Sequence, residues 1–474
     1  MEKQFVAQIA DIESDFPQWY TDVVVKTKLV DYGPVKGTMV IRPYGYAIWE
    51  NIQNEFNTRF QAANYENAYF PLLIPMSFMT KEAEHVEGFA PEVAVVTHAG
   101  GEKLQEPLCV RPTSETIIGT MFGKWVESWR DLPVRMNQWA NVMRWEKTTR
   151  PFLRTSEFLW QEGHSVFATA EEAEEETQKM LSVYEEFAKT CLAMPVLTGL
   201  KTEKEKFAGA VATYGMEAMM HDGKSLQSGT SHYLGQNFSK AFDIKFTDKD
   251  GAQKYGYTMS FGVSTRLIGA IIMTHGDQRG LVLPPVVAPV QAVIVPIAMK
   301  KEGVLEACEA LSARLKAAGI RVKIDDSDNS PGWKFNEWEM KGVPIRIELG
   351  PRDIEAGKML VCRRDTLEKQ EIELKNAEIK IEALLDEISE NMYKRAKARM
   401  NDRIVDAETL EELLDGVNKG NFVRAGWCGC RACEDKVKEF AQATSRVMDK
   451  KHTAKTCVTC GKQAKHTVFF ARAY

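Results

Sequence analysis

The most constraining feature of the sequence is a basic loop flanked by two stretches in which residue types alternate with a period of two, between residues 138 and 166. Successive side chains of a strand point to opposite faces of a sheet. The first stretch therefore groups on one face Ala140, Val142, Arg144 and Glu146, and the second stretch groups Phe158, Trp160, Glu162, His164 and Val166. Pro151 interrupts regular structure between them, next to the basic residues Lys147, Arg150 and Arg154. The pattern predicts a β-hairpin with a basic connection.

The face of the second predicted strand carries unusual chemistry, because an acid and an imidazole stand beside two aromatic rings where a core strand would repeat Val, Ile and Leu. Rings and a carboxylate suit a small, partly apolar cation. The neighbouring guanidinium groups suit a phosphate. Together they indicate a site for an amino acid and ATP. The alternative is a packed hairpin in which Glu162 and His164 satisfy each other and the arginines stay solvated.

Length and composition describe a soluble protein of several domains. A chain of 474 residues is too long for one core, and two to four domains are expected. Its 44% apolar and 27% charged residues are ordinary for globular proteins. The first residues lack the pattern of a signal peptide. The most apolar stretch, residues 281–299, is interrupted by prolines. We expect a cytoplasmic protein that does not span a membrane.

Local patterns predict the remaining elements. Helices are expected at residues 4–12, 46–63, 76–86 and 170–193, a loop at 15–20, and a strand at 67–74 that contains Pro71. The apolar stripe of the second helix indicates core packing or a dimer contact. After a proline-rich linker at 284–289, strands and helices alternate as in an α/β domain of about 100 residues. We place domain boundaries after residues 284 and 395.

Three further segments indicate ligand chemistry. Thr113 and Glu115 stand at a helix start, where they either cap the helix or line a pocket. The charged stretch 201–209 is a loop that could close over a ligand. Arg266 follows Gly262 at the start of another helix and is well placed to meet a phosphate, although a glycine and an arginine at this spacing are common.

The C-terminal region differs from the rest in charge and in cysteine content. The whole chain has a formal net charge of −5, but residues 421–474 hold 11 Lys and Arg against 4 Asp and Glu. Such a tail can contact nucleic-acid phosphates or simply be solvated. Two cysteine pairs, Cys428 with Cys433 and Cys457 with Cys460, have the spacing of a structural Cys₄ zinc site. Cys430 could replace a ligand, and reduced thiols without a metal are the alternative.

With these segments in view, the sequence resembles the prolyl-tRNA synthetases of the archaeal and eukaryotic-like type, class II aminoacyl-tRNA synthetases that lack the inserted editing domain of the bacterial type. The resemblance covers nearly the whole chain. The most specific matches are R-W-E…F-L-R-T-S-E-F-L-W-Q-E-G-H-S and G-T-S-H-Y-L-G-Q-N-F-S-K; others are the helix at 46–63 with the Pro71 strand, R-P-T-S-E-T, G-V-S-T-R, K-T-E-K-E-K-F-A-G, S-P-G-W-K-F-N-E-W-E-M-K-G-V-P-I-R and the terminal A-Y.

The resemblance implies an α+β fold: an antiparallel-sheet catalytic domain at 1–284 with six strands, an α/β anticodon-binding domain at 285–395 and a small zinc-containing α+β domain at 396–474. The implied catalytic residues are Arg144, Glu146 and Arg266. The implied ATP contacts are Arg144, Glu146, Arg154, Gln227, Thr230 and Arg266. The implied proline pocket consists of Thr113, Glu115, Phe158, Trp160, Glu162, His164, Phe207, His232 and Ser264.

The resemblance also implies substrates and partners. Proline, ATP with Mg²⁺ and tRNA(Pro) are expected, with a structural Zn²⁺ held by Cys428, Cys433, Cys457 and Cys460. A homodimer that forms through the helix at 46–63 and the Pro71 strand is also expected. The carboxylate of Tyr474 is expected to reach toward the active site. Candidate anticodon contacts in the second domain, with a structural ion pair as the alternative, are Trp333, Lys334, Glu339 and Arg352.

Two rival functions remain at this point. A class II synthetase for another small amino acid, such as threonine or serine, would need hydroxyl-binding groups in the pocket, and the aromatic face argues against it. A catalytically inactive RNA-binding relative would be expected to lose Arg144 or Arg266, and both are present.

Overall fold

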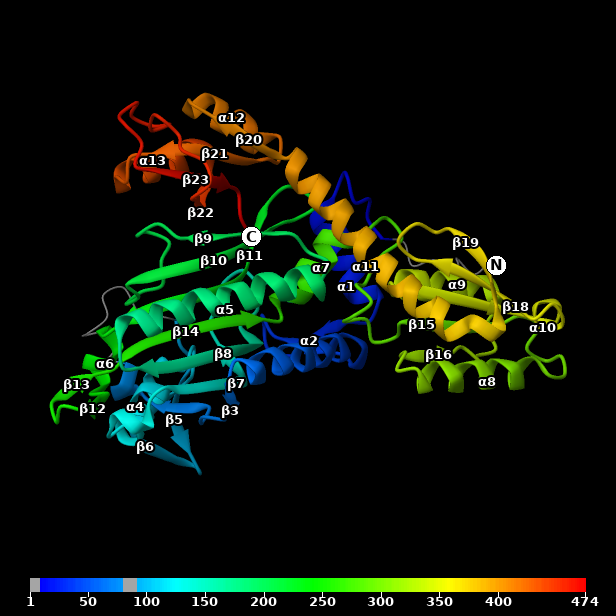
Figure 1. Ribbon diagram of the computed structural model, residues 1–474, viewed down its shortest axis with the longest axis horizontal. Helices are drawn as coiled ribbons and strands as arrows, with labels where there is room; N and C mark the ends of the chain where they lie inside the picture. The colour runs from blue at the N-terminus through cyan, green and yellow to red at the C-terminus, as the bar shows by residue number, and fades with distance from the viewer. Residues whose placement is uncertain (1–8, 80–91) are drawn as a thin grey trace.

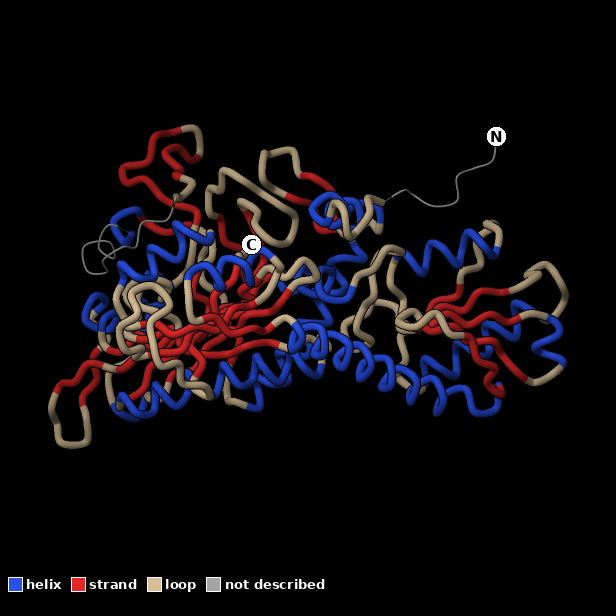
Figure 2. The backbone as a smooth tube through the Cα atoms, turned by 90° about the horizontal axis from the view of Figure 1, so that it is seen from above, coloured by secondary structure: helices blue, strands red, loops and turns tan. Residues whose placement is uncertain are grey.

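The computed structural model describes residues 9–79 and 92–474. A large central sheet, a second sheet and a small third sheet follow one another along the chain (Figure 1). Seen from above, the strands of the first two form separate groups flanked by helices (Figure 2). In the described part of the chain no helix is both long enough and apolar enough to cross a membrane.

The central sheet contains seven strands in the order β3-β7-β8-β14-β11-β10-β9. The six strands from β7 to β9 pair antiparallel, and only the two-residue edge strand β3 pairs parallel. This agrees with the six antiparallel strands that the resemblance implied. The strands are β3 Glu66–Asn67, β7 Val134–Met143, β8 Glu157–Phe167, β9 Val196–Leu200, β10 Ala212–Met219, β11 Ser225–Gly235 and β14 Tyr257–Ser264.

The predicted hairpin is confirmed as the pair β7–β8, with Val142 opposite Phe158 and Ala140 opposite Trp160. The first strand begins and ends earlier than expected, at Val134 and Met143, so Arg144 and Glu146 lie just beyond it. The Arg144 amide still donates to the Ser156 carbonyl at 2.8 Å, which keeps the start of the loop beside the sheet.

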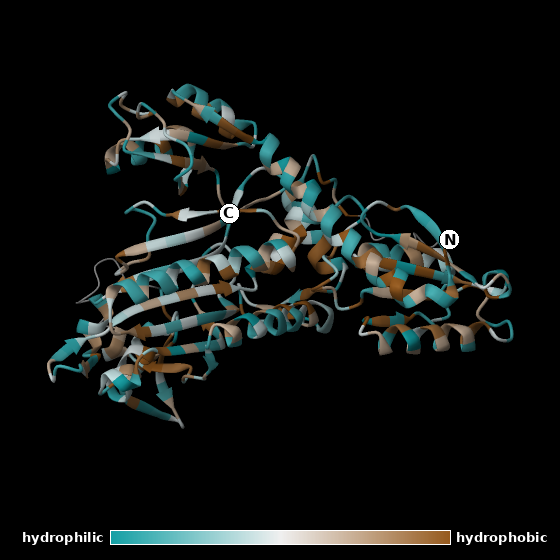
Figure 3. Ribbon diagram, in the orientation of Figure 1, coloured by the Kyte–Doolittle hydropathy of each residue, from teal (hydrophilic) through white to brown (hydrophobic). Residues whose placement is uncertain are grey.

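Two helices cover one face of this sheet and leave the other for the site. The predicted helices are α2 (Pro43–Ala62) and α5 (Ala170–Thr190), and the apolar stripe of α2 lies in the core, where Phe56 stacks on Phe187 of α5 at 3.7 Å between ring centroids. The Tyr184 hydroxyl of α5 donates to the Gln161 side chain of β8. Alternation along β8 then points the even-numbered residues 158–164 to the opposite face. The outer surface of α5 is polar (Figure 3).

Two local predictions are wrong. Residues 15–20 are not a loop but begin α1 (Phe16–Lys26), because Asp15 caps the helix by accepting from the Gln18 amide and Pro17 occupies the first turn, where its missing N–H costs nothing. The strand expected at 67–74 is divided by Pro71 into β3 and β4 (Leu73–Pro75), which belong to different sheets. The helices expected at 4–12 and 76–86 fall largely outside the described residues.

Smaller elements surround the central sheet. A three-stranded sheet contains β4, β5 and β6, and two-stranded sheets pair β1 with β2 and β12 with β13. Their bounds, with those of the nearby helices, are β1 Val30–Tyr32, β2 Met39–Ile41, β5 Val95–Ala99, β6 Glu102–Val110, β12 Lys245–Thr247, β13 Gln253–Tyr255, α4 Glu115–Trp125, α6 Asn237–Phe242, α7 Arg266–His275 and the 3₁₀ turn η1 Trp129–Asp131.

The second sheet confirms the predicted alternation of strands and helices. It has the order β16-β15-β17-β18-β19, with β15 parallel to both of its neighbours. Its elements are β15 Ala292–Pro296, α8 Val304–Ala317, β16 Val322–Ile324, α9 Pro331–Met340, β17 Ile345–Leu349, α10 Pro351–Glu355, β18 Lys358–Arg363, β19 Lys369–Glu373 and the turn η2 Leu374–Asn376.

One long helix, α11 (Ala377–Asp402), leads from the second sheet to the third (Figure 1). The boundary that we placed after residue 395 falls inside this helix. The third sheet has the order β20-β21-β23-β22. Its elements are β20 Ile404–Ala407, α12 Leu410–Asn418, β21 Phe422–Trp427, α13 Arg431–Ala441, β22 Thr444–Asp449 and β23 His466–Ala471. β22 packs against β9 and β10 of the central sheet.

Candidate active site and cysteine cluster

A cavity of about 330 Å³ lies over the face of the central sheet that α5 leaves free. Strands β8, β11 and β14, the start of α4 and the loop at 201–209 all contribute to its wall. Its volume is in the range of small-molecule sites. All nine residues predicted for proline binding line it, as do Arg144, Gln227, Thr230 and Arg266.

Aromatic rings and a guanidinium group meet in this cavity. The rings of Phe158 and Trp160 lie perpendicular to each other at 5.9 Å. The Arg144 guanidinium carbon lies 5.6 Å and 5.5 Å from their ring centroids, and its Nε donates to the Pro112 carbonyl at 3.0 Å. Burial lowers the pKa of Arg144, although nearby carboxylates oppose this shift. The result is a fixed, partly desolvated cation beside an apolar wall.

A buried group of two carboxylates and an imidazole stands next to the rings. Glu162 accepts hydrogen bonds from His164 Nε2 and Gln138 Nε2, both at 2.9 Å, and from the Ser114 hydroxyl. Burial alone would raise the pKa of Glu162, but these bonds lower it, and Glu162 in turn raises the pKa of His164 against the effect of burial. Each group of the pair therefore favours the charged form of the other.

Glu115 differs from Glu162 because its hydrogen bond comes from the Thr113 hydroxyl. Burial raises the pKa of Glu115, with Glu162 adding to the shift and His164 opposing it. A positively charged ligand would stabilise the ionised form of this buried carboxyl group. On the other side of the cavity, burial and the nearby Lys201 lower the pKa of His232 to about 3, so this imidazole is neutral and can pack on the Phe207 ring, 4.7 Å away.

The opposite end of the cavity is basic. Arg266 donates from Nε to the Leu153 carbonyl at 3.0 Å, and burial together with Arg154 and Arg144 lowers its pKa to about 10. The positive charges of Arg144, Arg154 and Arg266 act on one another here, and such a group of arginines suits a polyphosphate. Glu146 and Arg154 form an ion pair at 3.8 Å and do not line the cavity, although both were predicted to contact ATP.

Sequence reasoning missed several lining residues. Thr213 belongs to a strand with no distinctive motif, Ser260 precedes the G-V-S-T-R segment on β14, and Glu205 was included only as part of the charged loop. Lys201 pairs with Glu217 at 3.0 Å inside the protein, a partner that no local pattern indicates.

The four predicted zinc ligands come together. The sulfur atoms of Cys428, Cys433, Cys457 and Cys460 all lie within 4.8 Å of one another. Cys428 Sγ is 3.7 Å from that of Cys433 and 3.8 Å from that of Cys460. Four sulfurs at about 2.3 Å from a tetrahedral ion would be separated by about 3.8 Å, so the geometry fits Zn²⁺. Cys430 is exposed and outside the cluster.

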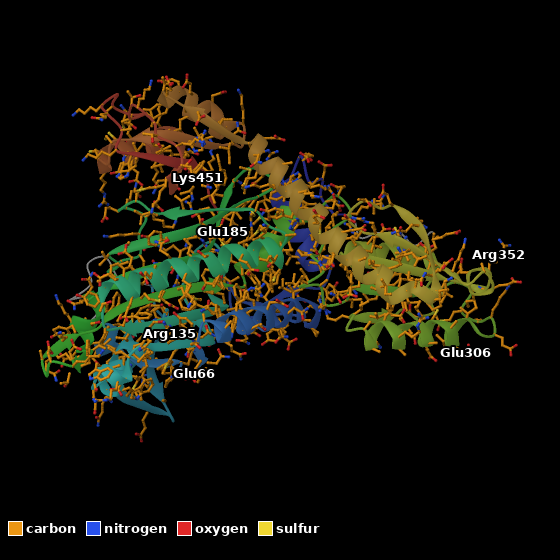
Figure 4. The ribbon with its side chains drawn as sticks, in the orientation of Figure 1. Glu66, Arg135, Glu185, Glu306, Arg352 and Lys451 are labelled. Carbon is orange, nitrogen blue, oxygen red and sulfur yellow. The ribbon has the colours of Figure 1, made fainter. Side chains whose placement is uncertain are left out.

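The predicted anticodon residues differ in their contacts and exposure. Lys334 is buried, and its Nζ donates to the Asp325 carbonyl at 2.8 Å. Glu339 pairs with Arg346 at 2.8 Å and with Arg279 at 3.0 Å. Trp333 is half-buried at the start of α9, whereas Arg352 is exposed at the outer end of the second domain (Figure 4).

The C-terminal residue packs beside the central sheet and outside the cavity lining. The Tyr474 amide donates to the Ser225 carbonyl at 3.1 Å, and its hydroxyl donates to Asp222 at 2.7 Å.

Comparison with known proteins assigns the family. Residues 97–275 match the class II tRNA synthetase core domain (G, H, P, S and T), residues 291–384 match an anticodon binding domain and residues 410–474 match the C-terminal domain of prolyl-tRNA synthetases. A proline–tRNA ligase of Alkaliphilus oremlandii is 60% identical over 100% of this chain and 99% of its own length. The chain belongs to the prolyl-tRNA synthetases.

Other members of this family support the assignment. Proline–tRNA ligase 2 of Clostridioides difficile is 56% identical over 100% of this chain and 99% of its own. The crystal structure of the prolyl-tRNA synthetase of Cryptosporidium parvum, solved with halofuginone and AMPPNP, has a TM-score of 0.94 and 42% identity over 98% of this chain and 99% of that one.

The buried Glu162–His164 pair of this prolyl-tRNA synthetase predicts a pH-dependent stability. The raised pKa of His164 means that the pair stabilises the fold fully below the unfolded histidine pKa of about 6.5, and that this contribution is lost as the pH rises through the folded value. Glu162→Gln should therefore destabilise the protein by about 3–5 kcal/mol at pH 6 and by less at pH 9. Thermal unfolding at both pH values measures this.

Asp415→Asn, which removes an exposed ion pair with Lys419, is the matched control and should change stability by at most about 1 kcal/mol at either pH. Equal destabilisation by Glu162→Gln at pH 6 and pH 9 would contradict a protonated His164.

Proposed function

We propose that the cavity binds L-proline at its aromatic and acidic end and ATP at its basic end, and that the chain ligates proline to tRNA(Pro). The observation that carries this proposal is the convergence of Phe158, Trp160, Glu115, Arg144 and Arg266 on a single cavity. A carboxylate and rings complement the ammonium and the hydrocarbon of proline, and guanidinium groups complement phosphates.

The reaction follows from this placement. A carboxylate oxygen of proline attacks the α-phosphorus of ATP, and the bond to pyrophosphate breaks to leave prolyl-adenylate. A ribose hydroxyl at the 3′ end of the tRNA then attacks the carbonyl carbon, and AMP leaves. Arg144 lies between the two proposed subsites, so it can neutralise charge on both reacting groups. Positioning and charge neutralisation are sufficient for this chemistry, without a covalent nucleophile.

The individual assignments are proposals of the same kind. Glu115 and Thr113 would hold the proline ammonium, and Phe207, His232 and Ser264 would complete that subsite. Arg266, Gln227 and Thr230 would hold ATP; Glu146 and Arg154, at the rim, would reach it once it is bound. Mg²⁺, when bound, would neutralise the phosphates and be held largely by ATP and water.

Binding of tRNA and assembly of the protein complete the proposal. The second domain would read the anticodon; among the predicted residues, the exposed position of Arg352 and the half-buried position of Trp333 support contact with RNA, while the contacts of Lys334 and Glu339 equally suit a structural role. We propose domains at 1–284, 285–395 and 396–474, a cytoplasmic location, and a homodimer formed near α2. The exposed side chains Val40, Tyr46 and Leu73 support an interface there.

Amino-acid-dependent exchange of pyrophosphate into ATP tests the function directly. Across the twenty amino acids, proline should give the highest kcat/KM. Alanine and cysteine fit the space but make fewer apolar contacts, so their kcat/KM should be about 10–200-fold lower than that of proline. Arg266→Ala should reduce kcat with proline by about 10²–10³-fold, because a charge-stabilising group is lost. Arg130→Ala, which removes an exposed arginine of the same domain, should leave kcat unchanged.

Exchange that is faster with threonine or serine would establish the first rival function. No exchange with any amino acid would establish the inactive relative.

We further propose that Zn²⁺ occupies the cysteine cluster and stabilises the third domain. The purified protein should contain one zinc per chain by atomic spectroscopy. Cys457→Ser should lose it, because this substitution removes one of the four clustered sulfur atoms. Cys430→Ser should keep the metal. Loss of zinc from Cys430→Ser and retention in Cys457→Ser would contradict this ligand set.

A further inference from the structure

The loop at 201–209 lines one wall of the cavity but is held from outside by the third domain. Lys201, Glu205 and Phe207 face the cavity. The loop joins β9, which is one edge strand of the central sheet, to its neighbour β10. β22 of the third domain lies against both strands (Figure 1). Gly199 of β9 comes so near to β22 that a side-chain Cβ there would be 2.5 Å from the Met448 carbonyl oxygen.

The first connection is a buried cluster of three charges. Glu217 is fully buried, and its carboxylate accepts from Lys201 Nζ at 3.0 Å and from the Arg446 guanidinium at 3.0 and 3.1 Å. Ser225 Oγ adds a bond at 2.8 Å. Lys201 and Arg446 together keep the pKa of Glu217 below its usual range although burial would raise it. Without Arg446, the buried Glu217 carboxylate would keep Lys201 and Ser225 but lose its hydrogen bonds from the third domain.

Two more connections hold the next residues of the loop. The Thr202 hydroxyl donates to Glu434 at 2.7 Å, and the same carboxylate accepts from Ser445. Lys204 Nζ pairs with Asp435 at 2.6 Å. Glu434 is buried, whereas the Lys204–Asp435 pair is partly exposed. The loop is therefore fixed at three successive points before it turns to present Phe207 against His232.

The two carboxylates belong to the part of the third domain that contains the cysteine cluster. Cys433 lies in the first turn of α13, and Glu434 and Asp435 follow it directly. Cys433 of the cysteine cluster and the two carboxylates that contact the loop therefore share one helical turn.

We propose that the third domain positions the amino-acid end of the cavity, with Arg446, Glu434 and Asp435 acting as positioning residues for the loop at 201–209. The inference rests on the proposed placement of the proline subsite. It assigns to this domain a role in the affinity for proline, separate from any contact with tRNA. None of the hydrogen bonds described for Arg446, Glu434 and Asp435 goes to Arg144 or Arg266, so we expect the effect to fall on proline more than on ATP.

Steady-state pyrophosphate exchange on the full-length protein tests the proposal, with KM measured separately for proline and ATP. Arg446→Met should raise the KM for proline about tenfold, within the usual range of coupling between sites, and change the KM for ATP less than about twofold. Arg446→Lys, which keeps the positive charge and one donor nitrogen, should raise the KM for proline less than Arg446→Met does. Arg424→Met is the matched control, because Arg424 lies in the same domain and pairs with Asp406 and Asp449 of that domain and not with the loop.

If Arg446→Met does not fold, exchanging the charges of the partly exposed Lys204–Asp435 pair provides a second test. Lys204→Glu and Asp435→Lys should each raise the KM for proline about threefold by opposing like charges, and the double variant should return it to within about twofold of the unaltered protein. Zinc content and thermal unfolding of every variant separate lost positioning from lost metal or lost fold.

Values for the Arg446 and Lys204 variants that match the Arg424 control, or an equal rise in both KM values, would overturn the inference. Failure of the unaltered protein to exchange pyrophosphate with proline would instead overturn the proposed function, so the two outcomes are distinct.

Discussion

The placement of unlike charges on one desolvated sheet face is the constraint on which the rest of the structure depends. Arg144 touches the rings of Phe158 and Trp160, and the Glu162–His164 pair and Glu115 stand on the same face. Charges in such a place are costly unless each is paired or held for a ligand. The opposite face is packed by α5 and α2, which gives the strands the rigidity that this arrangement needs.

Charge pairing also connects the three domains. Arg364 of the second domain forms a bidentate ion pair with Asp277 of the first domain. Arg446 of the third domain forms hydrogen bonds with the buried Glu217 of the first. An apolar cluster that includes Met219, Val447 and Phe469 seals the contact between the central and third sheets. The cavity is thus built by one domain, and the loop along one of its walls is held by contacts with another.

The sequence was informative where a pattern is local and periodic. Alternation along residues 158–166 predicted both the strand and the shared face of its rings and charges, and cysteine spacing predicted the cluster. Prediction failed at Pro17, because proline in a first helical turn looks the same as proline in a loop. The partners of Lys201 and Lys334 could not be read from the sequence, because the groups that satisfy a buried lysine are set by tertiary contacts. Arg446 lies 229 residues from Glu217, and no motif joins them.

A crystal structure of the protein with proline and a non-hydrolysable ATP analogue tests the central claim most directly. The account predicts the proline ring against Phe158 and Trp160, its ammonium on Glu115, and the triphosphate between Arg144 and Arg266. An analogue whose phosphates lie away from both arginines, or a proline bound outside this cavity, would contradict it.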